Sequence, residues 1–250
     1  MAKKTGLGQK FYVHGYDLSG DVGAINTCRT GVALLDTTAI EETQHTRLQG
    51  LSDGEISFAL FFNDALAQEH LALKALPTTD RLVMYLTGTT RGDAAACLTA
   101  LQVSYGWNRG ADGALLGTVQ ALSNADPVEW AELLVAKVTH SSATDETGIN
   151  NTVQTTKGGV GFLQHFSAAS GTVEYDIEDS SDSTNGVDGV WANLLAFSDV
   201  STPWSQIAQR VEVTGTVEKW VRASTNGTFT TAVFAMAFFR GTDNDRVDLS

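Results

Sequence analysis

Residues 173–178 read VEYDIE and alternate apolar and acidic side chains without a break. This period of two is typical of a β-strand with one face in a core and the other in solvent. Further along, apolar-rich stretches at 216–223 and 229–239 flank the pair Asn226-Gly227 and predict a strand, a tight turn and a strand. Asn-Gly suits a type I′ turn because both residues adopt positive φ angles at low cost.

The rest of the last third of the chain continues this pattern. Short segments of strand-like composition recur at hairpin-scale spacing, which indicates a β-sandwich of immunoglobulin-like or jelly-roll type. They cover residues 161–167, 172–178, 191–197, 210–213, 216–224 and 229–240.

The first 140 residues also favour strands. Ile56, Phe58 and Leu60 alternate with polar or small residues, so they predict a half-buried strand after a turn at 50–54. One short helix is expected over 65–76, capped by Asn63 or Asp64 and ended by Pro77. Further strands are expected at 81–87, 97–105, 114–122 and 128–139, although 129–138 also fits a helix. Residues 141–157 lack apolar periodicity and predict a linker.

Composition limits the classes of function. The chain has 250 residues, of which 42% are hydrophobic and 18% charged, so a sizeable core is expected. The net charge is −13, with −7 in residues 1–150 and −6 in residues 151–250. Such an acidic chain is not expected to bind the phosphate backbone of nucleic acid tightly, because tight binding requires clustered Lys and Arg.

The termini and cysteines give expectations about the compartment. No apolar segment follows the basic N-terminal residues, and the longest apolar run, 232–239, is too short to span a membrane. Cys28 and Cys97 lie far apart in sequence and predict two buried free thiols. A soluble protein made in a reducing cytoplasm is expected.

No motif predicts catalysis, and neither a metal nor a cofactor is expected. No histidine pair has HExxH spacing, and no GxSxG or GxxxxGK[ST] motif occurs. The glycines of 158–161 open a strand, so they do not form a phosphate loop at a helix N-terminus. The histidines are His14, His45, His70, His140 and His165.

Two binding hypotheses stay open beside a structural role. Asp179, Asp182, Asn185 and Asp188 recur every three residues and could bind calcium, although their spacing is not that of an EF-hand loop. A solvated loop is the alternative. Four aromatic residues could form a platform for sugar rings or pack in the core; they are Tyr175, Trp191, Trp204 and Trp220.

Two blocks of sequence carry a family resemblance. The first contains YDLSGDVGAI at 16–25, LLDTT at 34–38, RLQGLSDGEISF at 47–58 and FND at 62–64. The second contains RVEVTGTVEKWVRAS at 210–224, GTF at 227–229 and AMAFFR at 235–240. The first block resembles the opening of major tail (tail tube) proteins from long-tailed phages of actinobacteria. The second resembles the sandwich domain appended to such proteins.

The resemblance implies a structural virion protein of the phage tail that is not an enzyme. It implies self-assembly into stacked hexameric rings, contacts with other tail proteins, and a lumen through which DNA passes without specific binding. An acidic wall would let DNA slide without adhering. Loops such as 37–49 or 88–96 could become ordered only against the next ring.

The expected architecture is mainly β. Residues 1–145 form a tail-tube β-sandwich or barrel domain with one short helix, residues 146–157 a linker, and residues 158–250 a β-sandwich that decorates the outside. The alternatives are a carbohydrate-binding β-sandwich protein and a capsid decoration protein.

Overall fold

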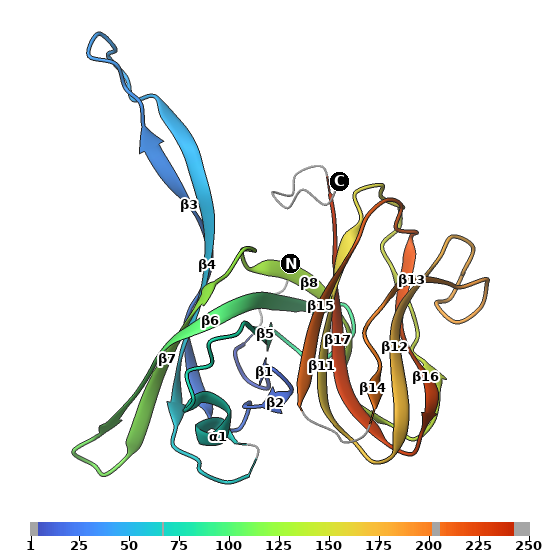
Figure 1. Cartoon of the computed structure of the whole chain (residues 1–250). Helices are drawn as coiled ribbons and strands as arrows, with labels where there is room; N and C mark the ends of the chain where they lie inside the picture. Colours follow the sequence, from blue (N-terminus) through green and yellow to red (C-terminus); the bar gives the residue numbers. More distant parts are fainter. Residues whose placement is uncertain (1–4, 67, 202–205, 243–250) are drawn as a thin grey trace.

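The computed structural model describes residues 5–66, 68–201 and 206–242 (Figure 1). Within these residues the chain is mainly β, as predicted, with two antiparallel sheets and one short helix, α1 (Glu69–Leu73). Trp204, one of the four aromatic residues of the sugar-platform hypothesis, lies outside the described residues.

The larger sheet contains eleven of the strands found in the described residues. Eight follow one another across the sheet: β15 (Ile207–Val213), β11 (Gly159–Ala168), β17 (Ala232–Arg240), β8 (Glu129–His140), β6 (Ala94–Arg109), β5 (Arg81–Leu86), β1 (Lys10–Val13) and β2 (Tyr16–Asp17). The other three branch from β6: β7 (Leu115–Ser123), then β4 (Arg47–Phe61), then β3 (Val22–Asp36).

The smaller sheet contains six strands of the described chain. It packs against β11, β17 and β15 and completes the sandwich (Figure 1). Its strands are β10 (Ile149–Asn150), β16 (Trp220–Phe229), β12 (Gly171–Ser180), β13 (Ala192–Ala196), β14 (Val200–Ser201) and β9 (Thr144–Asp145).

The VEYDIE stretch forms the middle of β12, as its period of two predicts. Val173, Tyr175 and Ile177 are fully buried and meet Leu163 and Phe234 from the larger sheet. The alternation therefore buries every second side chain between the two layers. The β-sandwich expected for the last third of the chain is present.

The apolar run over residues 232–239 has a different cause. In β17, Phe234 and Met236 face the sandwich core, whereas Ala235 and Ala237 face a second core with Tyr12 and other residues of the first half. A strand buried on both faces is apolar throughout. β17 also pairs with β11 on one side and with β8 on the other, so it joins the two halves of the chain.

The segment expected to be a linker forms short pairings. Ile149 pairs with Val221, and Thr155 forms a bridge to Val217. This segment therefore lies against β16, at one side of the sandwich. The domain boundaries at 145 and 157 remain a prediction.

Two turns expected from glycine are wrong. Asn226 and Gly227 lie inside β16, opposite Glu174 and Val173, and the chain turns instead between Phe229 and Ala232. That turn leads from the smaller sheet to the larger one, so β16 and β17 are not a hairpin. Gly227 has a φ of +90°, and a Cβ there would lie 2.5 Å from the carbonyl oxygen of Thr172. Close approach of two backbones, not a turn, requires this glycine.

The expected turn at residues 50–54 is part of β4, which runs unbroken from Arg47 to Phe61. Gly54 is buried, and a Cβ there would lie 2.9 Å from the backbone nitrogen of Val128. The helix expected over 65–76 is also shorter, because only Glu69–Leu73 is helical. The ambiguous segment 129–138 is a strand, β8, as favoured.

We predict that Gly54→Ala lowers the free energy of unfolding by about 1–3 kcal/mol, because the added methyl group collides with backbone that cannot move aside. Gly106→Ala is the matched control, since no atom lies within 4 Å of a Cβ at that strand position. Urea denaturation of both variants provides the measurement. Equal losses in both variants would contradict the close-approach explanation.

Candidate assembly surface

Four strands form a sheet that projects from the body of the molecule, in the order β3-β4-β7-β6 (Figure 1). In the middle of this projecting sheet, Phe58 of β4 lies between Ile25 of β3 and Val119 of β7. Val119 in turn pairs with Tyr105 of β6. Only residues 104–109 of β6 belong to it fully, because the first half of β6 pairs with β5 and β8.

Both outer strands of the projecting sheet have an open edge. Among the described residues, β3 pairs with β4 alone, and residues 104–109 of β6 pair with β7 alone. An open edge presents a row of backbone N–H and C=O groups that another strand can pair with. The sheet is therefore able to gain a strand on either side.

The two faces of the projecting sheet differ. One face carries Ile56, Phe58 and Leu60 of β4 and Val119 of β7, all buried against a core that includes Leu73 of α1. The opposite face carries no core. Its side chains are exposed or half-buried and include Ser57, Ala59, Thr118 and Gln120.

The hairpin of β3 and β4 continues far beyond this sheet as an arm, defined here as residues 32–51 (Figure 1). Its tip is ordered by local bonds: the Thr37 amide donates to the Thr46 carbonyl over 2.9 Å, and His45 Nδ1 lies 3.1 Å from Asp36 Oδ2. The exposed large apolar side chains of the arm are Leu34, Leu35, Ile40, Leu48 and Leu51. Five exposed large apolar side chains on one projecting element are typical of an interaction surface.

The loop between β4 and α1 is held in place by two buried carboxylates. Asp21, just before β3, accepts from Asn63 Nδ2 over 2.8 Å and from the Glu69 amide over 3.3 Å. Glu69, which is fully buried, accepts from the Asn63 amide over 2.8 Å and from Tyr105 Oη over 3.3 Å. Because Asp21 precedes β3 and Tyr105 lies in β6, α1 is bonded beside both open edges.

Tyr105 also bonds to His70, with 2.7 Å between Oη and Nδ1. Burial raises the pKa of Tyr105 to about 12, so the phenol keeps its proton. Burial also raises the pKa of Glu69, and the nearby Asp21 carboxylate raises it further. Glu69, Tyr105 and His70 therefore form one hydrogen-bonded chain from the interior to the sheet edge.

The histidines do not gather into a site. His14 lies beside Arg81, and burial together with that charge lowers its pKa to about 4. His165 bonds to Tyr175 Oη over 2.7 Å in the sandwich core. His140 bonds to Thr225 and Glu146, and His45 to Asp36 in the arm. In the described residues no group of three or more His, Cys, Asp or Glu could hold a metal ion.

The acidic segment considered for calcium binding is a loop that is stabilised by hydrogen bonds among its own residues. Asp188 accepts from Thr184 Oγ1 over 2.6 Å and from the Thr184 amide over 2.8 Å, and these bonds lower the pKa of Asp188 to about 2. Asp182 accepts from the Val190 amide, and Asp179 from the Glu218 amide. The carboxylates are thus used to hold the loop.

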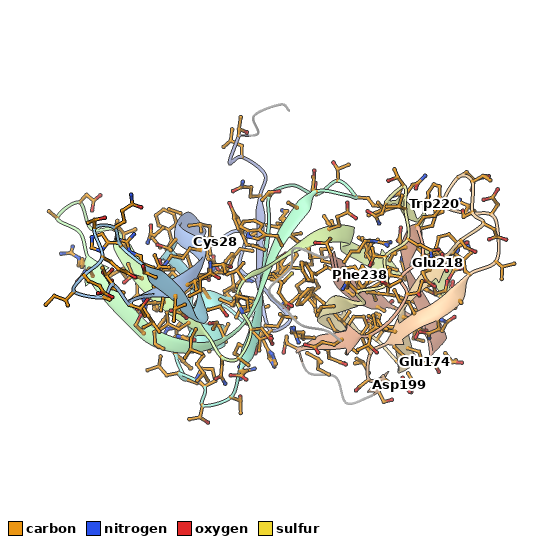
Figure 2. The ribbon with its side chains drawn as sticks, turned by 90° about the horizontal axis from the view of Figure 1, so that it is seen from above. Cys28, Glu174, Asp199, Glu218, Trp220 and Phe238 are labelled. Carbon is orange, nitrogen blue, oxygen red and sulfur yellow. The ribbon has the colours of Figure 1, made fainter. Side chains whose placement is uncertain are left out.

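Of the four aromatic residues considered for sugar binding, the three that the structure describes do not form a shared platform. Tyr175 is fully buried, and Trp220 is also buried. The Arg222 guanidinium lies 4.3 Å from the centroid of the Trp191 ring and covers one of its faces. Figure 2 shows Trp220 in the half of the molecule opposite to the one that holds Cys28.

Both cysteines are free thiols. Cys97 is buried, as predicted, whereas Cys28 in β3 is only half-buried. Burial raises the pKa of the Cys28 thiol to about 11. None of the helices in the described residues is long and apolar enough to cross a membrane.

Comparisons with known proteins give likeness only at the level of structure. No protein family model matches the chain, and no curated protein matches it. Solved structures similar to it include the tail of an empty GTA particle with C6 symmetry, with 14% identity over 52% of this chain and 98% of that one, and a TM-score of 0.38.

The SPP1 Dit protein, described as a hub of the adsorption apparatus of phages that infect Gram-positive bacteria, is 14% identical. The match covers 93% of this chain and 99% of Dit, with a TM-score of 0.36. A chain of the phage p2 baseplate in its activated conformation with Sr is 8% identical over 94% of this chain and 99% of that one, with a TM-score of 0.32. At these TM-scores the likeness alone assigns no function.

We predict that Glu69→Gln changes how stability depends on pH. Because the folded-state pKa of Glu69 lies above the ordinary 4.5, its stabilising contribution is full below 4.5 and is lost as the pH rises through the folded value. Asp21, Tyr105 and His70 are the other titratable groups in contact with this site.

The side chain of the Glu69→Gln variant does not ionise. The free energy of unfolding of the variant minus that of the natural chain should therefore increase as the pH rises from 4 to 8. Tyr105→Phe removes the hydrogen-bond donor to ionised Glu69. In this variant the free energy of unfolding should therefore fall more steeply with rising pH than in the natural chain. Urea denaturation at a series of pH values provides the measurement. Parallel curves for all three chains would show that Glu69 does not titrate in this window.

Proposed function

We propose that this chain is a structural subunit of a phage tail that closes into rings through the open edges of its projecting sheet. The observation that carries the proposal is the pair of open edges on opposite sides of one sheet. A contact between two different surfaces of identical copies repeats from copy to copy and closes into a ring when the rotation allows it.

The direction of the strands supports this closure. Every pairing in the projecting sheet is antiparallel, so with four strands β3 and β6 run in opposite directions. Copies related by rotation about an axis along the strands would place β3 of one copy antiparallel to β6 of the next. A closed barrel made in this way has no edge left.

We propose a ring of six copies, as the family resemblance implies. Six copies would supply about 24 strands, and at about 4.8 Å between strands the barrel would measure about 37 Å between opposite backbones. A lumen of that order admits a DNA duplex. Residues 1–145 would provide the ring, residues 158–250 the outward sandwich, and residues 146–157 the connection between them.

The arm provides the contact along the tail. It projects beyond the sheet and exposes apolar side chains, such as Leu51 at 88% and Leu34 at 63% exposure. A second ring stacked on the first would cover them, which supports tail-tube assembly with other copies and with other tail proteins. The chain would then be made in the host cytoplasm, reside in the virion, and have no catalytic role.

Ring closure predicts a specific change in hydrogen exchange. Electron microscopy of negatively stained protein should show six-fold rings or tubes, and amides of residues 22–36 and 104–109 should gain protection when the protein assembles. Amides of β11, already paired on both sides in one copy, should not change. Assembled particles in which the two edges still exchange rapidly would contradict edge pairing, and a monomer at high concentration would contradict assembly.

Stacking predicts a separate effect of the arm. We expect the double variant Leu34→Ser with Leu48→Ser to form single rings but tubes at least tenfold shorter, because apolar area covered between rings is lost. Both side chains are exposed, so the free energy of unfolding of one copy should change by about 0.5 kcal/mol or less. Val187→Ser, an exposed apolar site on the sandwich, is the control. Tubes of natural length from the double variant would exclude this contact.

A further inference from the structure

The core beneath the projecting sheet ends in half-buried side chains at both open edges. At the β3 edge these are Val22, Ile25 and Cys28, and at the β6 edge they are Tyr105 and Trp107. All five pack against the core, and each keeps part of its surface exposed. The core of a single copy is therefore incomplete at either edge.

A cavity of about 210 Å³ lies beside the β3 edge, between the start of β3 and the N-terminal segment. Phe11 of β1 and Tyr85 of β5 line it from the core, and Val22 and Ile25 line it from β3. Leu7 also lines the cavity and is 88% exposed. The cavity thus offers a largely apolar wall next to an unpaired strand.

The walls of this cavity are held by bonds within one copy. Tyr85 Oη donates to Gln9 Oε1 over 2.5 Å, and the Phe11 amide donates to Ser19 Oγ over 3.0 Å. The Phe11 ring packs on the Phe58 ring, with 4.5 Å between centroids. A preformed site of this kind binds an occupant without first having to be ordered.

The β6 edge presents aromatic rings that are also fixed in place. The Trp107 ring lies edge-on to the Tyr105 ring, with 5.6 Å between centroids, and edge-on to the Phe62 ring at 5.1 Å. Phe62 is 38% exposed, and its ring lies 5.0 Å from that of His70. Trp and Tyr are the aromatic residues that most often dominate the energy of protein interfaces.

The faces of the sheet decide which side chains of two paired edges would meet. The registers place Trp107 in one row with Leu60 and Val22, on the face that carries the core. Side chains keep their face across paired strands, and a shift of two residues does not change it. If β6 of one copy pairs with β3 of the next, Trp107 therefore lies on the side where the cavity is.

We propose that Trp107 of one copy inserts into the cavity beside β3 of the next copy, so that each contact between neighbours completes two open cores. The inference rests on the proposed ring. Within one copy Trp107 and the cavity lie at opposite edges, three strand spacings or about 14 Å apart, so only a second copy brings them together. Repetition of this contact between unlike surfaces is what a ring requires.

The chemistry of the cavity suits an indole ring. Among the described residues that line it, Lys10 alone is charged, and an ammonium group attracts the face of an aromatic ring. Backbone pairing alone allows several registers between two strands, whereas a side chain in a cavity fits only one. Trp107 would therefore fix the register between copies as well as strengthen the contact.

Sedimentation velocity over a range of concentrations tests both sides of the contact. Leu7→Asp places a carboxylate where the ring of the neighbour would bury it, and Trp107→Ala removes the ring. We expect each variant to raise the concentration needed for ring assembly at least tenfold. Val190→Asp and Trp130→Ala are the matched controls, at side chains that are 76% and 50% exposed, and should stay within twofold of the natural chain.

A charge exchange tests the contact without relying on loss alone. Trp107→Arg would face Lys10 of the neighbour and should assemble worst, although Arg can still stack on Tyr105 in its own copy. The chain that carries both Trp107→Arg and Lys10→Glu should assemble at a concentration at least tenfold lower than Trp107→Arg alone. Because the two positions lie at opposite edges of one copy, this recovery arises only between copies.

The outcomes separate the two proposals. No recovery in the double variant, or assembly of Leu7→Asp and Trp107→Ala at the natural concentration, would overturn the insertion of Trp107 while leaving edge pairing in place. Urea denaturation shows whether Leu7→Asp, at an exposed position, keeps the stability of the natural chain. Failure of the natural chain to form rings in negative stain would instead overturn the proposed function.

Discussion

The structure depends on one strand, β17, being buried on both faces and paired on both edges. Its alternate side chains fill two cores, with Phe234 and Met236 in one and Ala235 and Ala237 in the other. Its edges pair with β11 and β8. Because neither core is complete without it, the sandwich and the first half of the chain fold as parts of one sheet system, and a truncation before residue 232 would open both cores.

This shared strand fixes the position of the projecting sheet. Arg210 of β15 reinforces the connection, since its guanidinium makes two bonds of 2.8 and 2.9 Å to buried Glu129 of β8. Gln164 of β11 donates to the Leu82 carbonyl over 2.9 Å and accepts from the Gly15 amide over 2.6 Å. Buried bonds of this kind specify one relative arrangement, because breaking them would leave unpaired polar groups in the interior. The open edges are therefore presented in a fixed orientation.

The sequence predicted the mainly β class and most strands, because alternation such as VEYDIE directly reflects one buried face. Glycine was less informative: Gly54 and Gly227 permit close backbone approach within strands, although each equally fits a turn. The apolar run of β17 predicted a strand but not burial on two faces. The open edges and the Glu69–Tyr105–His70 chain join residues distant in sequence, and no local pattern carries that information. The polar face of β4 was visible in advance as the partner of the apolar one.

The distribution of charge follows from the same arrangement. The whole net charge of −13 lies outside the four strands, whose own charges cancel. If every copy carried part of that excess on its edge strands, neighbouring copies of the proposed ring would repel one another at the paired edges, since like charges on adjacent strands destabilise a sheet. Charge on the remaining surface would keep free copies apart in solution and would oppose the proposed ring closure little, because it is distant from the edges and screened by salt. Arg29 and Asp36 cancel in β3, and residues 104–109 of β6 hold only Arg109, so the low net charge of the two outer strands would favour the proposed pairing between copies.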